Sequence, residues 1–515
     1  MRRLCAIVSV LLLVSLLLGN LSCAKTTPTP SPAPAPAPTP TDITIAISAF
    51  PFTLDYADQY GSGSVEVPIM QICEPLIGRD KAGNPIPKLA TSWEQMEPTR
   101  WRFHLREGVK FHNGDAFTSK DVVEWVKWNI EITGLLLDTL PLKEAVAIDD
   151  YTVDLVLTNY VPEFLWRVTY FYIFPSAICQ NRELATTTAI GTGPYKLVRW
   201  EKGREIVMEA FDGYWGEQPP IKDVKFILRQ ETAVRLGTVI TDEAQACDML
   251  SAEQAVDAPK TVSFPGMDVW GLRLDTAEGP DPILKDKRLR QAIAYSIDKK
   301  TLVDNIYMGY ATLLPSNQPA IPGWHGYNPD LPAVPYDLEK AKALVQEAGA
   351  VGKEISLVGT TGRYPKDREF VEAIGAMIAK TGLKVAVATY EPKNWGSYIL
   401  TNVAPHGEIT CDIAVNGAGA EYPGIEVNIG KMYKSGGAIS AYNDPVLDKM
   451  VDEAFAEEDP AAREQMLREI LVYGQEEFPV VWIAIYHLIW GLGENVEWDP
   501  APDGKMFLSE VSFSK

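Results

Sequence analysis

The chain has 515 residues, 46% hydrophobic and 22% charged, a composition typical of a globular protein with enough apolar surface for a large core. At about 100–200 residues per domain, this length is too great for one core and predicts roughly three units. The formal net charge of −21 argues against a nucleic-acid partner, because such a chain has no broad basic face to meet a phosphate backbone.

The N-terminus carries the pattern of an export signal. Arg2 and Arg3 precede an apolar run at 4–18, which fits a signal peptide and is short for a membrane span. The segment ending at Cys23 resembles a bacterial lipobox, although Asn20 stands where a leucine is usual. We therefore expect residues 1–22 to be removed and Cys23 to become a lipid anchor, with ordinary signal cleavage as the alternative.

A proline-rich segment follows this cysteine. From Thr26 to Thr41, proline alternates with threonine, serine or alanine, a composition that favours an extended polyproline II conformation. At about 3.1 Å per residue, it would reach on the order of 50 Å. Residues 23–41 are thus predicted to be an anchor and tether that hold a globular head outside the cell membrane.

The head begins with a predicted strand and continues as mixed α/β structure. Alternating β-branched or apolar residues predict strands at 43–47, 101–105 and 153–157. Thr118, with Asp121 three residues later, predicts the start of a helix. The helical spacing of Trp125 and Trp128 favours a core role over a recognition stripe.

Aspartates mark the starts of the later helices. Leu289, Ala292, Ile293 and Ile297 recur at helical spacing, and Asp298 is predicted to cap the next helix, which stops near Gly309. A further helix is predicted from Asp337 to Ala348, closed by Gly349. Two more begin at Asp-Pro pairs, where the aspartate is the N-cap and the proline the first helical residue: 444–445 and 459–460.

Catalytic and metal-binding motifs are absent from the sequence. There is no G-x-S-x-G, no P-loop and no pair of histidines at metal-binding spacing. His112 precedes Asn113-Gly114, which predicts a turn more than a metal ligand. The six cysteines form no C-x-x-C pair, so a disulfide among the scattered ones is left open. We expect no enzyme activity, metal or cofactor.

Several blocks, in order, resemble one protein family. They are CEPLIGRDKAGNPIPKLATSWE (73–94), WRFHLREGVKFHNGDAFTSKDVVEW (101–125), GTGPYKLVRWEKG (191–203), FDGYWG (211–216), LKDKRLRQAIAYSIDKKTLVDNIYMGYA (284–311), YNDPVLDKMVDEA (442–454) and FPVVWI (478–483). Together they are similar to family 5 of the ABC-transporter solute-binding proteins, which serve importers of oligopeptides, dipeptides and nickel.

This resemblance implies an α/β fold of two hinged lobes, like the type II periplasmic binding proteins, with an extra subdomain in lobe I. Lobe I would comprise 42–268, lobe II 269–480, and the chain would return to lobe I over 481–515. The crossings are expected near 266–272 and 478–490. The resemblance further implies that the protein encloses a solute, most simply a peptide, and delivers it to a membrane permease and its ATPase. We expect the protein to be a monomer.

The family's ligand-binding loop has a counterpart at 416–427. Glu421 and Tyr422 match part of its motif, whereas Ala418 replaces its aromatic residue. Gly424 replaces the acid that binds a peptide's amine in the family's peptide binders. Glu421 therefore becomes a candidate ligand residue with Tyr422, and Glu426 is a second possible substitute for the lost acid.

The resemblance also suggests Arg363, in the loop after a lobe II strand, as the partner of a ligand carboxylate, because a guanidinium grips a carboxylate in a bidentate way. Trp270 and Trp395 are candidate apolar walls of the site, with core packing as the alternative for each. Phe52 and Asp55 follow the first strand in a stretch that often faces the ligand in this family, and Asp55 is expected to be structural.

Three alternatives stay open. The same fold can carry an oligosaccharide, an opine-like compound or a nickel chelate in place of a peptide. A secreted hydrolase would need two carboxylates facing each other at about 5–10 Å. A surface chaperone or signalling receptor would use the same closure without transport.

Overall fold

A computed structural model of the chain describes residues 41–51, 53–55, 66–80, 84–131, 141–276, 282–391, 411–419, 424–500 and 505–514. The predicted signal peptide, the tether and Cys23 lie outside these residues. Within them, eleven strands form one mixed sheet in the order β15-β14-β16-β12-β17-β11-β1-β10-β9-β8, with β13 paired to β17. The chain therefore passes through the same sheet in both its first and second halves.

The first half of the chain supplies one end of this sheet. The predicted strand at 43–47 is confirmed as β1, which pairs in parallel with β10 and β11. Its strands and helices have these bounds: β1 Asp42–Ile47, α1 Val67–Met70, α4 Phe164–Val168, α5 Ser176–Cys179, α6 Arg182–Thr187, β8 Tyr195–Glu201, β9 Glu205–Ala210, β10 Asp223–Leu228, α7 Thr232–Ile240, β11 Ala246–Cys247 and α8 Ala252–Ala255.

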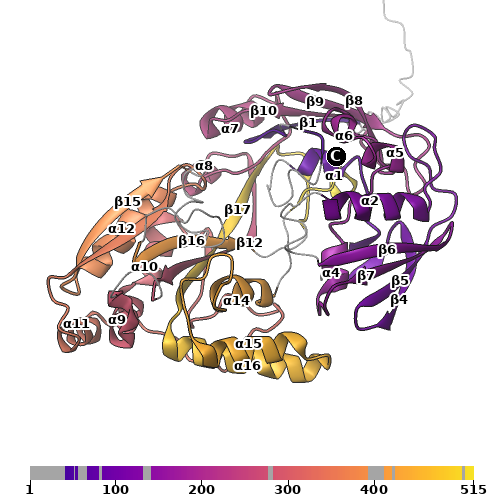
Figure 1. The fold of residues 1–515 in the computed structure, drawn as a ribbon. Coiled ribbons are helices and arrows are strands. Elements are labelled where there is room, and N and C mark those ends of the chain that lie inside the picture. Colours follow the sequence, from indigo (N-terminus) through magenta and orange to yellow (C-terminus); the bar gives the residue numbers. More distant parts are fainter. Residues whose placement is uncertain are drawn as a thin grey trace, which may run out of the picture. The chain divides into compact units, whose positions relative to one another are not determined.

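A separate four-stranded sheet lies within this half, in the order β4-β5-β7-β6. The predicted strands at 101–105 and 153–157 are two of its members, and α2 packs against β6 and β7 (Figure 1). Trp125 and Trp128 of α2 are buried, so the core role predicted for them is confirmed. The elements of this unit are β4 Ala90–Glu97, β5 Arg100–Leu105, α2 Ser119–Glu131, β6 Leu142–Asp149 and β7 Thr152–Leu157. Strands β2 Ile77–Arg79 and β3 Pro85–Pro87 pair only with each other, in a small sheet of their own.

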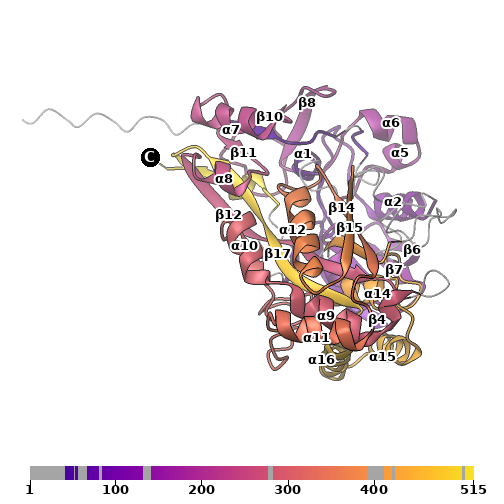
Figure 2. The same cartoon turned by 90° about the vertical axis from the view of Figure 1, so that its left-hand side faces the viewer.

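Two long strands connect the halves of the main sheet. Strand β12, Lys260–Leu274, pairs with the antiparallel β17, Val480–Leu492, from Lys260 opposite Leu492 to Arg273 opposite Val480. The ladder is irregular between Pro265 and Val269. The positions predicted for the chain crossings lie in these two strands, which run side by side in Figure 2.

The second half supplies the rest of the sheet, and both of its faces are buried. Trp270 and Leu272 of β12 pack into one hydrophobic cluster with α9, α10 and α12, whereas Val269 packs into another with α14, α15 and α16. Figure 2 shows α12 beside β14 and β15. The elements are α9 Lys287–Ser296, α10 Lys299–Ile306, β13 Ala311–Leu313, α11 Leu338–Glu347, β14 Glu354–Thr360, α12 Asp367–Ala379, β15 Lys384–Tyr390, β16 Ile413–Gly419, α14 Glu426–Met432, α15 Pro445–Ala456 and α16 Pro460–Glu477.

The predicted aspartate caps are confirmed. Asp298, Asp337, Asp444 and Asp459 each accept a hydrogen bond from a backbone N–H in the first turn of α10, α11, α15 and α16. At the start of α2, the carboxylate of Asp121 accepts from the backbone N–H of Thr118 at 2.9 Å. Side-chain caps of this kind satisfy donors that a helix start leaves unpaired.

The C-terminal residues return to the core of the first half. Trp498, Met506, Leu508 and Phe513 join the same hydrophobic cluster as β1, α2 and β9. Short strands β18, Val496–Glu497, and β19, Ser512–Phe513, pair with each other here. These clusters agree with the predicted return to lobe I, although the boundaries at 268/269 and 480/481 remain predictions.

The four cysteines among the described residues are free and buried: Cys73, Cys179, Cys247 and Cys411. Burial raises the pKa of the Cys73 and Cys179 thiols and raises the pKa of Cys247 to about 12. These thiols stay protonated at neutral pH, so they are poor nucleophiles and poor metal ligands.

Candidate functional site

Three neighbouring parallel strands direct the candidate site to one edge of the main sheet. Strand β14 pairs in parallel with both β15 and β16, so the carboxyl ends of all three lie at the same edge. The chain runs from β14 to β15 on one side and reaches β16 on the other. In open α/β sheets, ligands bind at the carboxyl edge where the strand order reverses in this way.

Arg363 lies in the loop after β14 at this carboxyl edge, and its conformation is fixed by a buried carboxylate. The backbone N–H groups of Gly362, Arg363 and Tyr364 donate to Asp367 at 3.1, 3.0 and 3.3 Å. The Arg363 guanidinium is exposed and lies 5.0 Å from the centroid of the Tyr364 ring. Among the described residues, no carboxylate forms an ion pair with it. It is therefore available to an external anion.

Three other candidate ligand residues fall outside the described residues. Trp395 lies in the segment that follows β15, and Glu421 and Tyr422 lie in the segment that follows β16. Their roles in ligand binding remain predictions. Phe52 is also outside the described residues, whereas Asp55 is fully buried, in line with the structural role expected for it.

Trp270 is in the core of the second half rather than on an open surface. Its side chain is 1% exposed and meets the rings of Tyr364 and Phe370 edge to face, at centroid distances of 5.0 and 5.2 Å. This packing agrees with the alternative that the sequence left open for it. Trp270 would affect a ligand indirectly, through its ring contact with Tyr364. Direct contact between Trp270 and a ligand remains a prediction.

Tyr364 connects the Arg363 loop to strand β12. Its hydroxyl donates to Oδ2 of Asp268 at 2.9 Å. Burial and the charge of Asp268 raise the pKa of Tyr364 well above its usual value, so the phenol stays a donor. The ring also lies beside Gly417 of β16, where a Cβ would stand 3.4 Å from the Tyr364 hydroxyl oxygen. The loop is thus bound across three adjacent strands.

The same loop contacts the first half of the chain. Lys366 directly precedes α12 and has a left-handed backbone, with φ of 62°. Its Nζ lies 3.1 Å from Oε1 of Glu253 in α8, a helix that precedes β12. Residues assigned to lobe I and lobe II by the sequence therefore meet beside Arg363.

Glu426, the proposed substitute for the lost acid, already has a partner. It is 3% exposed and pairs with Nδ1 of His325, whose Nε2 lies 3.2 Å from Oε2 of Glu464 in α16. The hydrogen bond to Glu426 and the charges of both carboxylates raise the pKa of His325, against the opposing effects of burial and of Arg463. A buried carboxylate bridged in this way is a structural anchor for the start of α14 and a poor site for a ligand amine.

His325 is expected to give the protein a pH-dependent share of its stability. Because its pKa is higher folded than unfolded, the stabilisation is complete below about pH 6.5 and is lost as pH rises through the folded value. We expect His325→Gln to lower the free energy of unfolding by about 1–2 kcal/mol at pH 6 and by less at pH 9. Urea unfolding at the two pH values measures this difference.

His104 provides the matched control for His325. It lies on β5, where its Nε2 is 3.6 Å from Oε1 of Glu94, and both side chains are exposed. His104→Gln should change the free energy of unfolding by less than about 1 kcal/mol at either pH. A His325→Gln deficit that stays the same from pH 6 to pH 9 would contradict the bridging role.

His112 belongs to a turn, as predicted. Gly114 has a φ of 92°, and Nε2 of His112 is 2.9 Å from the carbonyl oxygen of Gly193. Burial lowers the pKa of His112 to about 4, so the ring is neutral at physiological pH. Nowhere in the described part of the chain do three or more histidine, cysteine, aspartate or glutamate side chains gather as metal ligands would.

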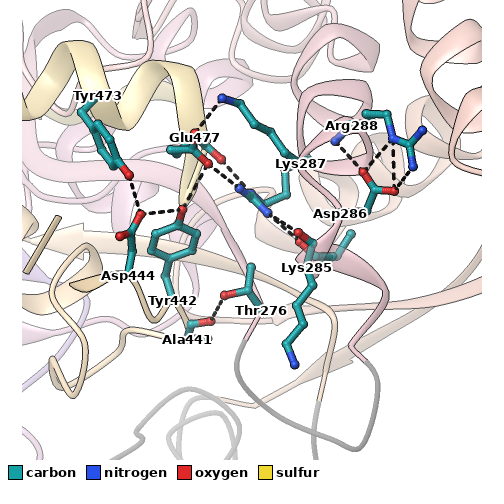
Figure 3. A network of polar contacts seen from close by, with 12 residues as sticks. Thr276, Lys285, Asp286, Lys287, Arg288, Ala441, Tyr442, Asp444, Tyr473 and Glu477 are labelled. Atoms are coloured by element: carbon teal, nitrogen blue, oxygen red, sulfur yellow. Dashed lines mark hydrogen bonds and ion pairs between the residues drawn. The ribbon is translucent and has the colours of Figure 1, made fainter. Parts of the chain in front are cut away.

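A buried polar network lies at the opposite, amino edge of the same parallel strands. Arg290 of α9 donates to the carbonyl oxygens of Leu284, Lys285 and Glu477 at 2.9, 3.0 and 2.7 Å, and to Oε2 of Glu477 at 3.0 Å. Lys287 pairs with Oε1 of Glu477 at 2.6 Å (Figure 3). The network joins α9 to the end of α16, just before β17, and serves the fold.

The comparison that decides the family concerns the middle of the chain. A family model described as bacterial extracellular solute-binding proteins, family 5, matches residues 84–439, well over half of the sequence. The chain belongs to this family. The predicted family is therefore confirmed, and with it a binding protein rather than an enzyme.

Relatives of the family 5 chain include the dipeptide-binding protein of Escherichia coli, 30% identical over 61% of this chain and 64% of that protein. Heme-binding protein A of Haemophilus influenzae is 25% identical over 78% of this chain and 79% of that protein. The crystal structure of the ABC transporter substrate-binding protein CtaP of Listeria monocytogenes has a TM-score of 0.81 at 20% identity, covering 93% of this chain and all of that one.

These likenesses confirm the two-lobe α/β fold predicted for the family 5 chain. No helix of the described residues is long and apolar enough to cross a membrane. The sequence predicted Arg363 as a ligand residue, a role that remains a prediction, and it gave no indication of two features beside it and at α14, the Tyr364–Asp268 hydrogen bond and the His325 bridge. The one local signal that could have drawn attention to Asp268 is that it is an acidic residue within the apolar sequence of β12.

Proposed function

We propose that this family 5 protein is the solute-binding component of an ABC importer and that its cargo is a short peptide. It would capture the peptide between two lobes and deliver it to a permease and its ATPase. Ligand contacts to both lobes exist only in the closed state, so the ligand itself shifts the population towards closure.

The observation that carries the peptide proposal is the Arg363 guanidinium. It projects from a loop that is rigidly held by Asp367, at the carboxyl edge of β14, and it has no acidic partner among the described residues. Arginine binds a carboxylate through two parallel hydrogen bonds, which suits the C-terminus of a peptide. Relatives named for dipeptide binding support the same cargo, and a relative named for heme binding supports a second, anionic class of cargo.

Thermal melting of the full chain in mild detergent tests this proposal against di- to pentapeptides, oligosaccharides, nickel chelates and heme. Ligand at 100 times its dissociation constant adds about 2.7 kcal/mol, a readily visible shift in melting temperature. We expect a shift with peptides. A shift with sugars, nickel chelates or heme alone would leave the family intact and overturn the peptide cargo.

Arg363→Ala is expected to weaken peptide binding by roughly 10- to 100-fold, because a charge-assisted bidentate pair is lost. Arg363→Lys should recover only part of the affinity, since an ammonium cannot form the bidentate pair. Isothermal titration measures both variants. Arg368→Ala is the matched control, because Arg368 lies exposed on α12 and pairs with Glu372. Equal affinity in Arg363→Ala and wild type would contradict the carboxylate anchor.

We further propose that the mature protein is a lipid-anchored monomer, with Cys23 carrying the lipid and residues 23–41 serving as the tether. The support is the pattern of a signal peptide, a lipobox-like segment and a proline-rich stretch in that order. Detergent phase separation of the expressed protein tests the anchor, and recovery from the aqueous phase would contradict it.

A further inference from the structure

Two contacts join the first and second halves of the chain outside strands β12 and β17. The hydroxyl of Tyr160, which follows β7, accepts a hydrogen bond from Nη1 of Arg463 in α16 at 3.2 Å, across 303 positions of the chain. Trp166 of α4 packs against Val427 of α14. Because each pair takes one member from each half, both contacts break when the halves move apart.

The second-half members of the two pairs are held in place by the His325 bridge. His325 pairs through Nδ1 with Glu426, and its Nε2 lies 3.2 Å from Oε2 of Glu464. Glu426 directly precedes Val427, and Glu464 directly follows Arg463. A single histidine therefore ties the start of α14 to α16 and presents Val427 and Arg463 together to the first half.

The environment of Arg463 makes the Tyr160 hydroxyl a valuable partner. Arg463 is 6% exposed, and no carboxylate in the described part of the chain forms an ion pair with it. Its guanidinium also donates to the carbonyl oxygen of Glu457 at 3.1 Å, whereas its Nε is buried without a hydrogen-bond partner there. A hydrogen bond from a charged donor is stronger than one between neutral groups, so the loss of Tyr160 would leave a buried charge less well satisfied.

Trp166 is held on the first-half side of its contact. Arg167 pairs with Oε1 of Glu163 at 2.7 Å within the same short helix, and both side chains are largely buried. The guanidinium of Arg79 in β2 lies 5.3 Å from the centroid of the Trp166 ring, within the range of a cation–π contact. An indole held in this way has little freedom to lose when Val427 packs on it, so the apolar area removed from water stabilises the contact.

We infer that Tyr160, Trp166, Val427 and Arg463 form a latch that stabilises the closed arrangement of the two halves whether or not a cargo is bound. Both contacts consist of protein atoms alone, so the latch acts equally on the liganded and the unliganded protein. A closed protein has to open before its cargo leaves, and the latch therefore slows release. This inference goes beyond the proposed function, because it does not depend on the chemistry of the cargo.

Lys366 provides a reporter of closure that requires no ligand. Its Nζ lies 3.1 Å from Oε1 of Glu253 in α8, in the first half, and 3.6 Å from Oε1 of Glu369 in its own helix α12. A carbodiimide joins an amine to a carboxylate without a spacer. The Lys366–Glu253 cross-link therefore forms while the halves are together, and the Lys366–Glu369 cross-link forms in either arrangement. Mass spectrometry of the digested protein gives the ratio of the two.

The test compares this ratio between wild type and variants of the full chain in mild detergent, refolded from urea to remove any co-purified cargo. Tyr160→Phe keeps the ring and loses the hydrogen bond, and Val427→Ala removes most of the apolar contact. In the double variant the ratio is expected to fall by roughly 3- to 10-fold, with each single variant in between. Tyr336→Phe is the matched control, because Tyr336 is 45% exposed and belongs to neither pair. Circular dichroism of each variant excludes misfolding.

Three results would overturn the latch. The double variant could keep the wild-type ratio, or Tyr336→Phe could lower the ratio as much as the double variant does. Wild type could also form the Lys366–Glu369 cross-link without the Lys366–Glu253 cross-link, which would show that the halves do not stay together without cargo. Each of these results leaves the proposed function intact. Conversely, a wild type that binds no peptide would contradict the proposed cargo and leave the latch standing.

Discussion

Replacing Arg290 with alanine is expected to lower the free energy of unfolding by about 3–5 kcal/mol, because it removes one partner of a buried ion pair. Arg290 is 3% exposed and donates to three backbone carbonyls as well as to Glu477. Its loss would leave the buried carbonyl of Leu284 and the partly buried carbonyl of Lys285 without this donor. Urea unfolding, followed by circular dichroism, measures the change.

Two tyrosines, Tyr442 and Tyr473, extend the same network, and Tyr442 contacts Glu477 directly. The Tyr442 ring lies 5.4 Å from the Arg290 guanidinium, and its hydroxyl contacts both Glu477 and Asp444 at 3.5 Å. Tyr473 donates to Asp444 at 2.7 Å (Figure 3). Since Asp444 caps α15, a disturbance at Arg290 is expected to reach the packing of α15 on α16.

Arg288 supplies the control for Arg290 from the same helix. It is about half exposed and forms its ion pair with Asp286, at 2.6 Å, on the surface. Arg288→Ala should therefore cost no more than about 1 kcal/mol. Arg290→Lys should fall between the two, because it keeps the charge and loses the planar array of donors. If Arg290→Ala and Arg288→Ala lowered the free energy of unfolding equally, the buried network would contribute no more stability than an exposed ion pair.

Gly191→Ala is expected to destabilise the protein by about 3 kcal/mol or more, through overpacking against the backbone. A Cβ at this position would lie 2.2 Å from the carbonyl oxygen of Ile72 and 2.7 Å from Cα of Cys73. Backbone atoms within a core cannot move aside as the end of a flexible side chain can. The readout is the urea midpoint, together with the yield of folded protein.

Gly237 is the control, because alanine at this position is expected to raise the free energy of unfolding rather than lower it. It lies inside α7, and a Cβ there would meet nothing within 4 Å. Gly237→Ala should stabilise the protein by about 0.5–1 kcal/mol, because alanine restricts the unfolded chain and favours the helix. If Gly191→Ala were equally harmless, the close approach of 191–193 to 71–73 would be irrelevant to stability.

Local signals in the sequence predicted the elements well. A helix cap depends on residues within one turn, so Asp298, Asp337, Asp444 and Asp459 could be identified without knowledge of the fold. The segment Gly191–Gly193 leads into β8 at Tyr195. Why glycine is required there was not visible, because the atoms it approaches belong to residues 72 and 73, more than 100 positions earlier.

Long-range pairs set the limit on predicting the site. Arg363 was predicted because its loop resembles the corresponding loop of a known family, but the absence of an ion pair at its guanidinium among the described residues is a property of the folded chain. The Tyr364–Asp268 hydrogen bond joins residues 96 positions apart. The same limit applies to Trp270. The sequence permits both a ligand wall and a core role for it, and only the 1% exposure of its side chain in the structure favours the core role.

The position of β17 in the main sheet constrains the order of folding. This strand pairs with β12 and β11, and the residues after it complete the hydrophobic cluster around β1, yet all of them are synthesised long after the strands they join. The first half of the chain therefore cannot reach its final packing until these later residues have been made. Because these contacts join distant parts of the chain, completion of the first-half core is expected to be a slow step of folding.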